Sequence, residues 1–168
     1  MTHPTWELSI DNTDAALVLT ACPGTKGTAL RASLEQLKQQ GVRAIVTALS
    51  YEEMEKAGVA QLPDLTQELG MSWCYQPIED DCAPNSDFDT GWQRNSPELQ
   101  SILDQGGKVA LHCMGGSGRT GLLAAHVLLQ RGWDLDTIKT EVKALRPGAF
   151  TKQVQLDYID GVAEKLAK

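Results

Sequence analysis

Short apolar runs, separated by polar or glycine-containing segments, recur along the whole chain. Runs of this kind, rich in Val, Ile, Leu and Ala, are typical of strands buried on both faces. The pattern predicts strands near Trp6–Ile10, Ala16–Thr20, Arg43–Leu49, Ser72–Gln76 and Lys108–Leu111.

Longer segments between these runs carry apolar residues at helical spacing. The residues Ser50-Tyr51-Glu52-Glu53 form a capping box, which predicts that a short helix starts there. The other predicted helices lie near Thr28–Gln40, Leu62–Leu69, Asp89–Asp104 (interrupted near Pro97), Gly121–Arg131, Asp134–Leu145 and Thr151–Ala167. Alternation of strands and helices predicts an α/β fold with a mostly parallel, twisted central sheet flanked by helices on both faces.

Composition and charge narrow the class of protein. The chain has 168 residues, of which 42% are hydrophobic, enough for the core of one domain spanning residues 1–168. We find no signal-peptide pattern at the N-terminus and no apolar run long enough to span a membrane, so we expect neither export nor membrane insertion. The sparse cysteines suit a reducing cytoplasm, and we expect a monomer. The net charge of −7 and the pI near 4.9 argue against nucleic acids and anionic membranes as main partners.

A glycine-rich segment, His112-Cys113-Met114-Gly115-Gly116-Ser117-Gly118-Arg119-Thr120-Gly121, lies between a predicted strand and a predicted helix. Backbone N–H groups in such a turn, together with the positive end of the following helix, stabilise a bound oxyanion. Gly115, Gly116 and Gly118 allow positive φ angles and close approach of the backbone to the ligand.

The side chains of this segment add a nucleophile to the anion site. A cysteine at a helix N-terminus beside an arginine is favoured as the thiolate, so Cys113 is the candidate nucleophile. Arg119 presents a planar fork that matches two phosphoryl oxygens. The Thr120 hydroxyl can donate a hydrogen bond to the Cys113 sulfur and help the thiolate leave. The alternative is an unreactive buried cysteine on the turn of a nucleotide-binding fold, although the phosphate loop Gly-x-x-x-x-Gly-Lys-Ser/Thr is absent.

The pattern His-Cys, five residues, Arg-Thr resembles the signature of the cysteine-dependent protein tyrosine phosphatase superfamily. Within it the chain is most similar to small dual-specificity phosphatases of the cyclin-dependent-kinase-associated type. Three further segments carry this resemblance, which covers about residues 16–160: Ala21–Lys26, Gln76–Asp80 followed by Pro84, and Leu145–Ala149 followed by Gln155. The resemblance implies a cofactor-free, metal-independent phosphatase that acts through a phosphocysteine. It also implies a phosphorylated protein as substrate, with a kinase as one candidate.

The resemblance also implies roles for individual residues. The general acid that protonates the leaving oxygen matches Asp80, with the adjacent Asp81 as the alternative. His112 would hydrogen-bond within the loop and tune the thiolate. Gln155 would position the attacking water, unless it is simply a solvated residue of the last helix.

The sequence also predicts the surroundings of the remaining histidines and the roles of the remaining cysteines. We expect His3 to be solvated or disordered and His126 to be packed in the core. The four cysteines form neither a metal-ligand pattern nor a disulfide framework. Cys22 and Cys82 are candidate redox partners of Cys113, or both are inert.

Two alternatives to protein dephosphorylation remain open. The first is a pseudophosphatase that binds phosphorylated partners without turnover. The second is a phosphatase of an inositol phosphate, a lipid or an RNA 5′-phosphate. The uncharged Met114 and Ser117 disfavour inositol phosphates and lipids, and the acidic chain disfavours RNA.

Overall fold

The computed structural model describes residues 2–167 and contains a five-stranded sheet. The strands lie in the order β1 (Thr5–Ser9), β2 (Ala16–Thr20), β5 (Lys108–His112), β3 (Val42–Thr47) and β4 (Ser72–Tyr75). The β1 strand pairs antiparallel with β2, and all other neighbours are parallel. This arrangement confirms the predicted mostly parallel sheet.

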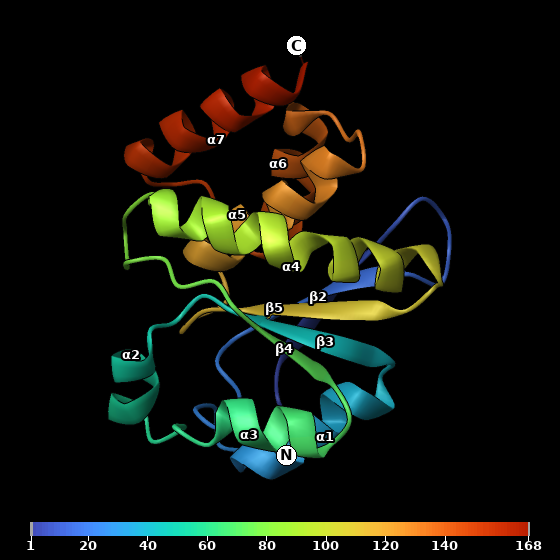
Figure 1. The fold of residues 1–168 in the computed structure, drawn as a ribbon, viewed down its shortest axis with the longest axis vertical. Coiled ribbons are helices and arrows are strands. Elements are labelled where there is room, and N and C mark those ends of the chain that lie inside the picture. The colour runs from blue at the N-terminus through green and yellow to red at the C-terminus, as the bar shows by residue number, and fades with distance from the viewer. Residues whose placement is uncertain (1, 168) are drawn as a thin grey trace.

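Helices cover both faces of the sheet, as predicted (Figure 1). On one face lie α1 (Leu30–Gln39) and α3 (Leu62–Glu68), and on the other α4 (Ser86–Asp104), α5 (Gly118–Gln130), α6 (Leu135–Leu145) and α7 (Gln153–Ala167). The short helix α2 (Tyr51–Lys56) follows the carboxyl end of β3 and lies to the side of the sheet. Its predicted capping box is present, because the Ser50 hydroxyl and the Glu53 carboxylate each accept a backbone N–H of the other residue.

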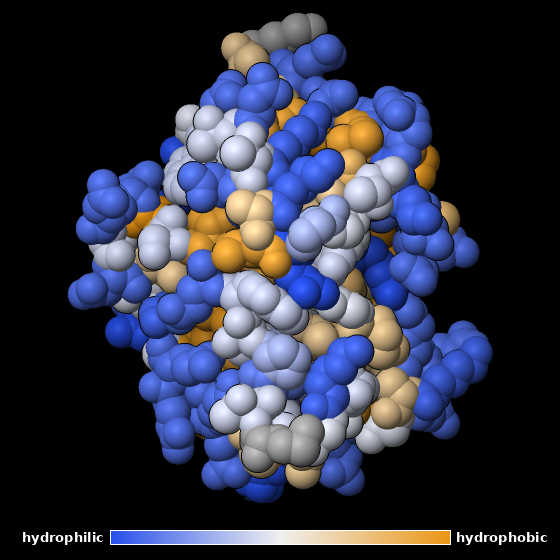
Figure 2. Space-filling model, turned by 180° about the vertical axis from the view of Figure 1, so that it is seen from behind, coloured by the Kyte–Doolittle hydropathy of each residue, from blue (hydrophilic) through white to orange (hydrophobic). Residues whose placement is uncertain are grey.

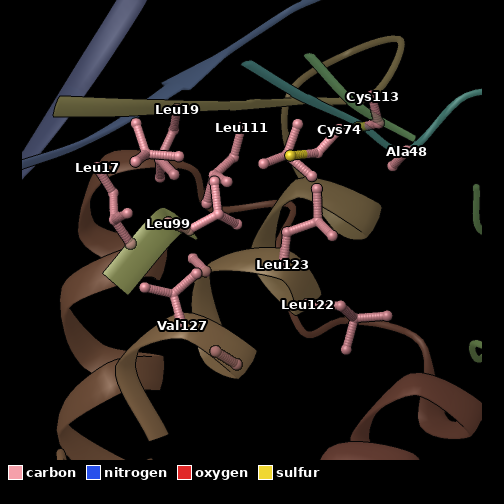
Figure 3. Packing of buried hydrophobic residues seen from close by; sticks show 14 of the residues in the cluster. Leu17, Leu19, Ala48, Cys74, Leu99, Leu111, Cys113, Leu122, Leu123 and Val127 are labelled. Carbon is pink, nitrogen blue, oxygen red and sulfur yellow. The ribbon is translucent and has the colours of Figure 1, made fainter. Parts of the chain in front are cut away.

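Alternate residues of the central strands pack into two separate clusters. Val18 and Ala110 contact the α1 side, whereas their neighbours Leu17, Leu19 and Leu111 belong to the larger cluster on the α5 side. Figure 3 shows that larger cluster, with Cys113 at one end of it. Cys113 therefore lies where the buried sheet meets the loops at its carboxyl edge.

Several predicted helix boundaries were wrong. The helix over Asp89–Asp104 starts earlier, at Ser86, because the Asn85 side chain caps it by accepting the N–H of Phe88 at 3.1 Å. The same helix continues through Pro97, whose ring lies on the exposed side, where loss of one backbone hydrogen bond costs least. The helix after the glycine-rich segment begins at Gly118, not at Gly121.

The prediction for His3 was also wrong, because this residue is only 2% exposed. Its backbone N–H donates to Gln36 of α1 at 2.8 Å, and the Gln36 amide donates back to the His3 carbonyl at 2.8 Å. Its ring lies 3.1 Å from the carbonyl oxygen of Ala21. The segment before β1 is therefore held against α1 and the end of β2.

The outer surface is mostly hydrophilic on the face seen in Figure 2, with small apolar areas between the polar side chains. Across residues 2–167, every helix is too short or too polar to cross a bilayer.

Candidate active site

The glycine-rich segment forms a tight turn between β5, which ends at His112, and α5, which begins at Gly118. Cys113 is the first residue of this turn and is 4% exposed. Its Sγ accepts hydrogen bonds from the Gly116 N–H at 3.3 Å and from the Thr120 hydroxyl at 3.1 Å. Both bonds stabilise a negatively charged sulfur. The predicted contact between Thr120 and the Cys113 sulfur is therefore present.

Gly116 is the one glycine of the turn whose backbone requires glycine. Its φ is +82°, and a Cβ at this position would lie 2.8 Å from the carbonyl carbon of Thr20. Of the three glycines that allow a positive φ, Gly116 adopts one, whereas Gly115 and Gly118 lie outside the left-handed region. A Cβ on Gly115 would meet no protein atom within 4 Å. The close packing of the turn against the end of β2 therefore depends on Gly116.

The His112 ring contacts the backbone of Cys113. Its Nδ1 donates to the carbonyl oxygen of Cys113 at 3.0 Å, so the neutral ring accepts at Nε2, from the Thr47 hydroxyl at 2.7 Å. Thr47 in turn accepts the indole N–H of Trp73 at 2.8 Å. Burial lowers the pKa of His112 to about 4. The ring is thus a neutral part of a buried chain of hydrogen bonds at pH 7.

Arg119 is 3% exposed and is held mainly through one nitrogen. Its Nη1 donates to both carboxylate oxygens of Glu53, at 3.0 and 2.9 Å, and to the carbonyl oxygen of Ile78 at 3.0 Å. Its Nε lies 3.5 Å from a carboxylate oxygen of Asp80 but makes no hydrogen bond within residues 2–167. The arginine is therefore oriented through Nη1, and among the described residues its buried Nε has only the ion pair with Asp80.

Asp80 and Asp81 both line the pocket that contains Cys113, but they have different partners. Asp80 pairs with Arg119, whereas Asp81 lies 3.7 Å from the Nζ of Lys152 and adopts a left-handed backbone with φ of +61°. Both side chains are well exposed, at 71% and 66%. Of the two carboxylates, Asp80 is thus the one that contacts Arg119.

The pocket has a volume of about 220 Å³, and its charged residues are Asp80, Asp81, Arg119 and Lys152. It brings together most of the predicted site residues with three that were not predicted. Its lining residues are Asp80, Asp81, Cys113, Met114, Gly115, Ser117, Gly118, Arg119, Gly148, Thr151, Lys152 and Gln155. Among residues 2–167, no three His, Cys, Asp or Glu side chains are grouped so that they could hold a metal ion.

Gln155 is buried, at 1% exposure, so its interpretation as a solvated residue was wrong. Its amide N–H donates to the carbonyl oxygen of Cys82 at 3.0 Å, which ties α7 to the loop after Asp81. Its Oε1 has no hydrogen-bond partner in the described part of the chain. A buried acceptor in a pocket favours a polar ligand or water beside it.

The remaining predicted residues lie in different surroundings. Cys22 is fully buried at the end of β2, and its backbone N–H donates to the Met114 carbonyl at 2.9 Å. Burial, followed by the effect of the neighbouring Cys113, raises the pKa of Cys22 to about 12. Cys82 is half-buried beside Gln155. His126 is packed as predicted, 6% exposed, 5.0 Å from the Phe88 ring and hydrogen-bonded to Tyr158 at 2.7 Å.

Sequence reasoning missed two residues that hold the site together. Glu53 was identified only as a helix cap, and nothing in its spacing indicated that it binds Arg119. Arg146 was identified within the segment Leu145–Ala149, but not as a residue that contacts the turn. It donates to the carbonyl oxygens of Gly115 at 2.8 Å and Gly116 at 3.1 Å.

Comparison with known proteins identifies the family. Residues 3–142 match the family described as Cyclin-dependent kinase inhibitor 3 (CDKN3). The chain belongs to this family. It is 32% identical to Cyclin-dependent kinase inhibitor 3 of Homo sapiens, over 98% of this chain and 80% of the human protein. The protein of Rattus norvegicus is also 32% identical, over 95% of this chain and 77% of the rat protein.

Solved structures agree with this membership of the CDKN3 family. The kinase-associated phosphatase, crystallised with its catalytic-site cysteine replaced by serine, is 28% identical, with a TM-score of 0.86 over 99% of this chain and 97% of that one. Tk-PTP in its active form is 25% identical, with a TM-score of 0.70 over 95% and 97% of the two chains. The predicted resemblance to dual-specificity phosphatases is therefore confirmed for family and fold.

Proposed function

We propose that this chain hydrolyses phosphomonoesters in proteins without a metal ion, through a phosphocysteine intermediate. The observation that carries the proposal is the convergence of Cys113, Arg119 and Asp80 on one small pocket. The sulfur already accepts two hydrogen bonds that favour its charged form, and Arg119, whose Nε makes no hydrogen bond within residues 2–167, lines the same pocket. Family membership and the fold of the kinase-associated phosphatase support the same reaction.

In the first step, the Cys113 thiolate attacks phosphorus and forms the S–P bond. Arg119 and the N–H groups of the turn, including that of Ser117, stabilise the equatorial oxygens. The bond between phosphorus and the leaving oxygen breaks, and Asp80 gives that oxygen its proton. The products of this step are the free alcohol or phenol and phosphocysteine.

In the second step, water attacks the phosphocysteine, and Asp80, now a carboxylate, takes the proton of the water. The S–P bond breaks and the electron pair returns to Cys113, which the Thr120 hydroxyl stabilises as a thiolate. Gln155 is our candidate for holding the attacking water, because its buried Oε1 lacks a protein partner. Inorganic phosphate is released, and the enzyme returns to its starting state.

We assign phosphoserine, phosphothreonine and phosphotyrosine side chains of proteins as the substrate class. The family is named for inhibition of a cyclin-dependent kinase, and the solved relative is described as a kinase-associated phosphatase. Both descriptions fit an enzyme that removes a phosphate from a kinase, so a phosphorylated kinase is the candidate partner. Phosphate binding without turnover, or hydrolysis of a non-protein phosphate, are the competing outcomes.

The test is steady-state hydrolysis of p-nitrophenyl phosphate and phenyl phosphate, with reductant and chelator present, by the natural chain and the variants Cys113→Ser, Asp80→Asn and Asp81→Asn. Cys113→Ser should abolish turnover. Asp80→Asn should slow the hydrolysis of phenyl phosphate more than that of p-nitrophenyl phosphate. Phenol is the poorer leaving group, so its departure depends more on protonation by the acid. Asp81→Asn should show no such difference between the two substrates.

Two results would contradict parts of the proposal. A folded natural chain that binds phosphate but turns over neither ester would be a binding module. If Asp81→Asn, rather than Asp80→Asn, showed the leaving-group dependence, the acid would be Asp81. Phosphopeptides compared with soluble inositol phosphates and 5′-phosphorylated RNA would then decide the substrate class.

A further inference from the structure

We propose that Arg146 and Trp6 are positioning residues that fix the backbone conformation of the catalytic turn without lining the pocket. Arg146 orients the peptide groups whose N–H bonds face the thiolate and the phosphate, and Trp6 holds Arg146 in place. The inference concerns the site described above and rests on the proposed function. It assigns a role in that site to β1, which contributes no residue to the pocket lining.

Arg146 contacts the turn but is not among the residues that line the pocket. It lies at the end of α6, where its backbone N–H donates to the Val142 carbonyl at 2.7 Å. Its Nη2 donates to the carbonyl oxygen of Gly115 at 2.8 Å and its Nε to that of Gly116 at 3.1 Å. A single guanidinium thus binds two successive carbonyl groups, a geometry that its planar fork allows and a lysine ammonium does not reproduce.

These two contacts also fix two N–H groups. In a trans peptide the C=O and the following N–H lie in one plane and point in opposite directions. When Arg146 binds the Gly115 carbonyl, it therefore orients the Gly116 N–H, which donates to the Cys113 Sγ at 3.3 Å. When it binds the Gly116 carbonyl, it orients the Ser117 N–H, and Ser117 lines the pocket.

The positive charge of Arg146 also favours the hydrogen bond that its position orients. A cation at the carbonyl end of a peptide group polarises it and strengthens the hydrogen bond that its N–H donates. The acceptor of one such bond is the nucleophilic sulfur. Arg146 therefore favours the thiolate of Cys113 without touching it.

Trp6, a residue of β1, holds the Arg146 guanidinium in place. The central carbon of the Arg146 guanidinium lies 3.8 Å from the centroid of the Trp6 ring, a cation–π contact. Trp6 itself is half-buried and pairs with Leu19 of β2, so its position is set by the edge of the sheet. Because β1 and α6 pack together, the stacked pair is part of the folded structure and not a contact between mobile surface chains.

The experiment measures the thiolate directly, without substrate. Iodoacetamide alkylation of Cys113 is followed between pH 4 and 9 by mass spectrometry of the peptide that contains it. The variants are Arg146→Met, Arg146→Lys, Trp6→Leu, Trp6→Phe and the double variant Arg146→Met with Trp6→Leu. Kinetics with p-nitrophenyl phosphate are measured in parallel.

We expect Arg146→Met to move the pH midpoint of alkylation upward by about one pH unit and to lower kcat/KM about tenfold near pH 6. Arg146→Lys should lie between Arg146→Met and the natural chain. Trp6→Leu should shift the midpoint in the same direction by a smaller amount. Trp6→Phe, which keeps an aromatic ring, should have a midpoint close to that of the natural chain. Adding Trp6→Leu to Arg146→Met should have no further effect, since Trp6 acts through the arginine.

Matched controls separate these effects from loss of charge or of a large side chain. Arg31→Met removes an arginine that pairs with Glu68 far from the turn, and Trp133→Leu removes another half-buried tryptophan. Neither should move the alkylation midpoint. Circular dichroism and thermal unfolding identify variants that fail to fold, and Arg146→Lys and Trp6→Phe then provide the comparison.

An unchanged alkylation midpoint in a folded Arg146→Met or Arg146→Lys variant would overturn the role of Arg146. A Trp6→Leu effect of the same size with and without Arg146 would overturn the role of Trp6. These outcomes are distinct from failure of the proposed function. If the natural chain hydrolysed no phosphate ester but the variants shifted the alkylation midpoint as expected, the positioning roles would stand and the proposed phosphatase activity would be wrong.

Discussion

Glu53 and Arg119 are joined by two hydrogen bonds from a single nitrogen, since Nη1 donates to both carboxylate oxygens at 3.0 and 2.9 Å. The same carboxylate accepts the backbone N–H of Ser50 at 3.2 Å as part of the cap of α2. Arg119 is thus tied to the start of a helix that contributes no residue to the pocket around Cys113. Arg119 is buried, so its orientation depends on this carboxylate.

Replacing Glu53 by Gln should lower kcat/KM by about 10²-fold, because a small misplacement of a phosphate-binding group costs that much. Stability should fall by on the order of 1 kcal/mol, as Nη1 keeps its bond to the Ile78 carbonyl. Steady-state kinetics and urea unfolding measure both effects. Glu55→Gln, an exposed carboxylate on the same helix, is the matched control and should change neither. Equal kinetics for the two variants would show that Glu53 does not orient Arg119.

Replacing Gly116 by Ala should disrupt the catalytic turn. The new Cβ would meet the end of β2 at 2.8 Å from the Thr20 carbonyl carbon, in a backbone conformation with φ of +82° that alanine disfavours. We expect a loss of at least about 2 kcal/mol of stability and of nearly all turnover. Urea unfolding and hydrolysis of p-nitrophenyl phosphate test this. Gly161→Ala on α7, whose Cβ would meet nothing within 4 Å, should leave both unchanged.

Buried histidines should make the protein less stable in mild acid. Burial lowers the pKa of His126 from 6.5 to about 4, so between these values the unfolded chain binds a proton that the folded chain does not. The free energy of unfolding therefore decreases as the pH falls from about 6.5 to about 4, by up to about 1.4 kcal/mol per pH unit for this residue. His112, with its pKa also lowered to about 4, adds a similar dependence.

Urea unfolding between pH 4.5 and 7 tests this prediction with His126→Phe, which should lose part of the pH dependence. Tyr158→Phe removes the hydroxyl bonded to His126 but keeps the ring, and it should retain the full dependence. An identical pH profile for the natural chain and His126→Phe would show that His126 titrates normally.

Oxidation should join Cys113 to Cys22 and not to Cys82. All four cysteines are free thiols in the structure, and burial of Cys22 beside Cys113 contributes to its raised pKa. Hydrogen peroxide converts the Cys113 thiolate to a sulfenic acid, and the Cys22 thiol then displaces water to form the disulfide. Non-reducing peptide mapping after peroxide treatment identifies the pair. Cys22→Ser should lose recovery of activity by dithiothreitol, whereas Cys82→Ser should keep it; the reverse would assign the role to Cys82.

Most of the architecture could be predicted because it depends on local patterns. The runs Ala16–Thr20 and Lys108–Leu111 have the short apolar pattern typical of buried strands, and the strand–glycine turn–helix order places Cys113 at the carboxyl edge of the sheet. The capping box at Ser50 could be predicted for the same reason, since both partners lie within one helical turn.

Tertiary structure decided what depends on residues far apart in the chain. The sequence by itself determined the strand-to-helix turn that carries Cys113 and Arg119 and the type of sheet, because spacing within one turn or one strand encodes them. It did not determine that Glu53 holds Arg119, that Arg146 holds the turn, or that Trp6 covers Arg146. It also misplaced His3, whose burial against Gln36 follows from how α1 packs on the sheet. Such contacts arise from the packing of separate elements, and no local pattern records them.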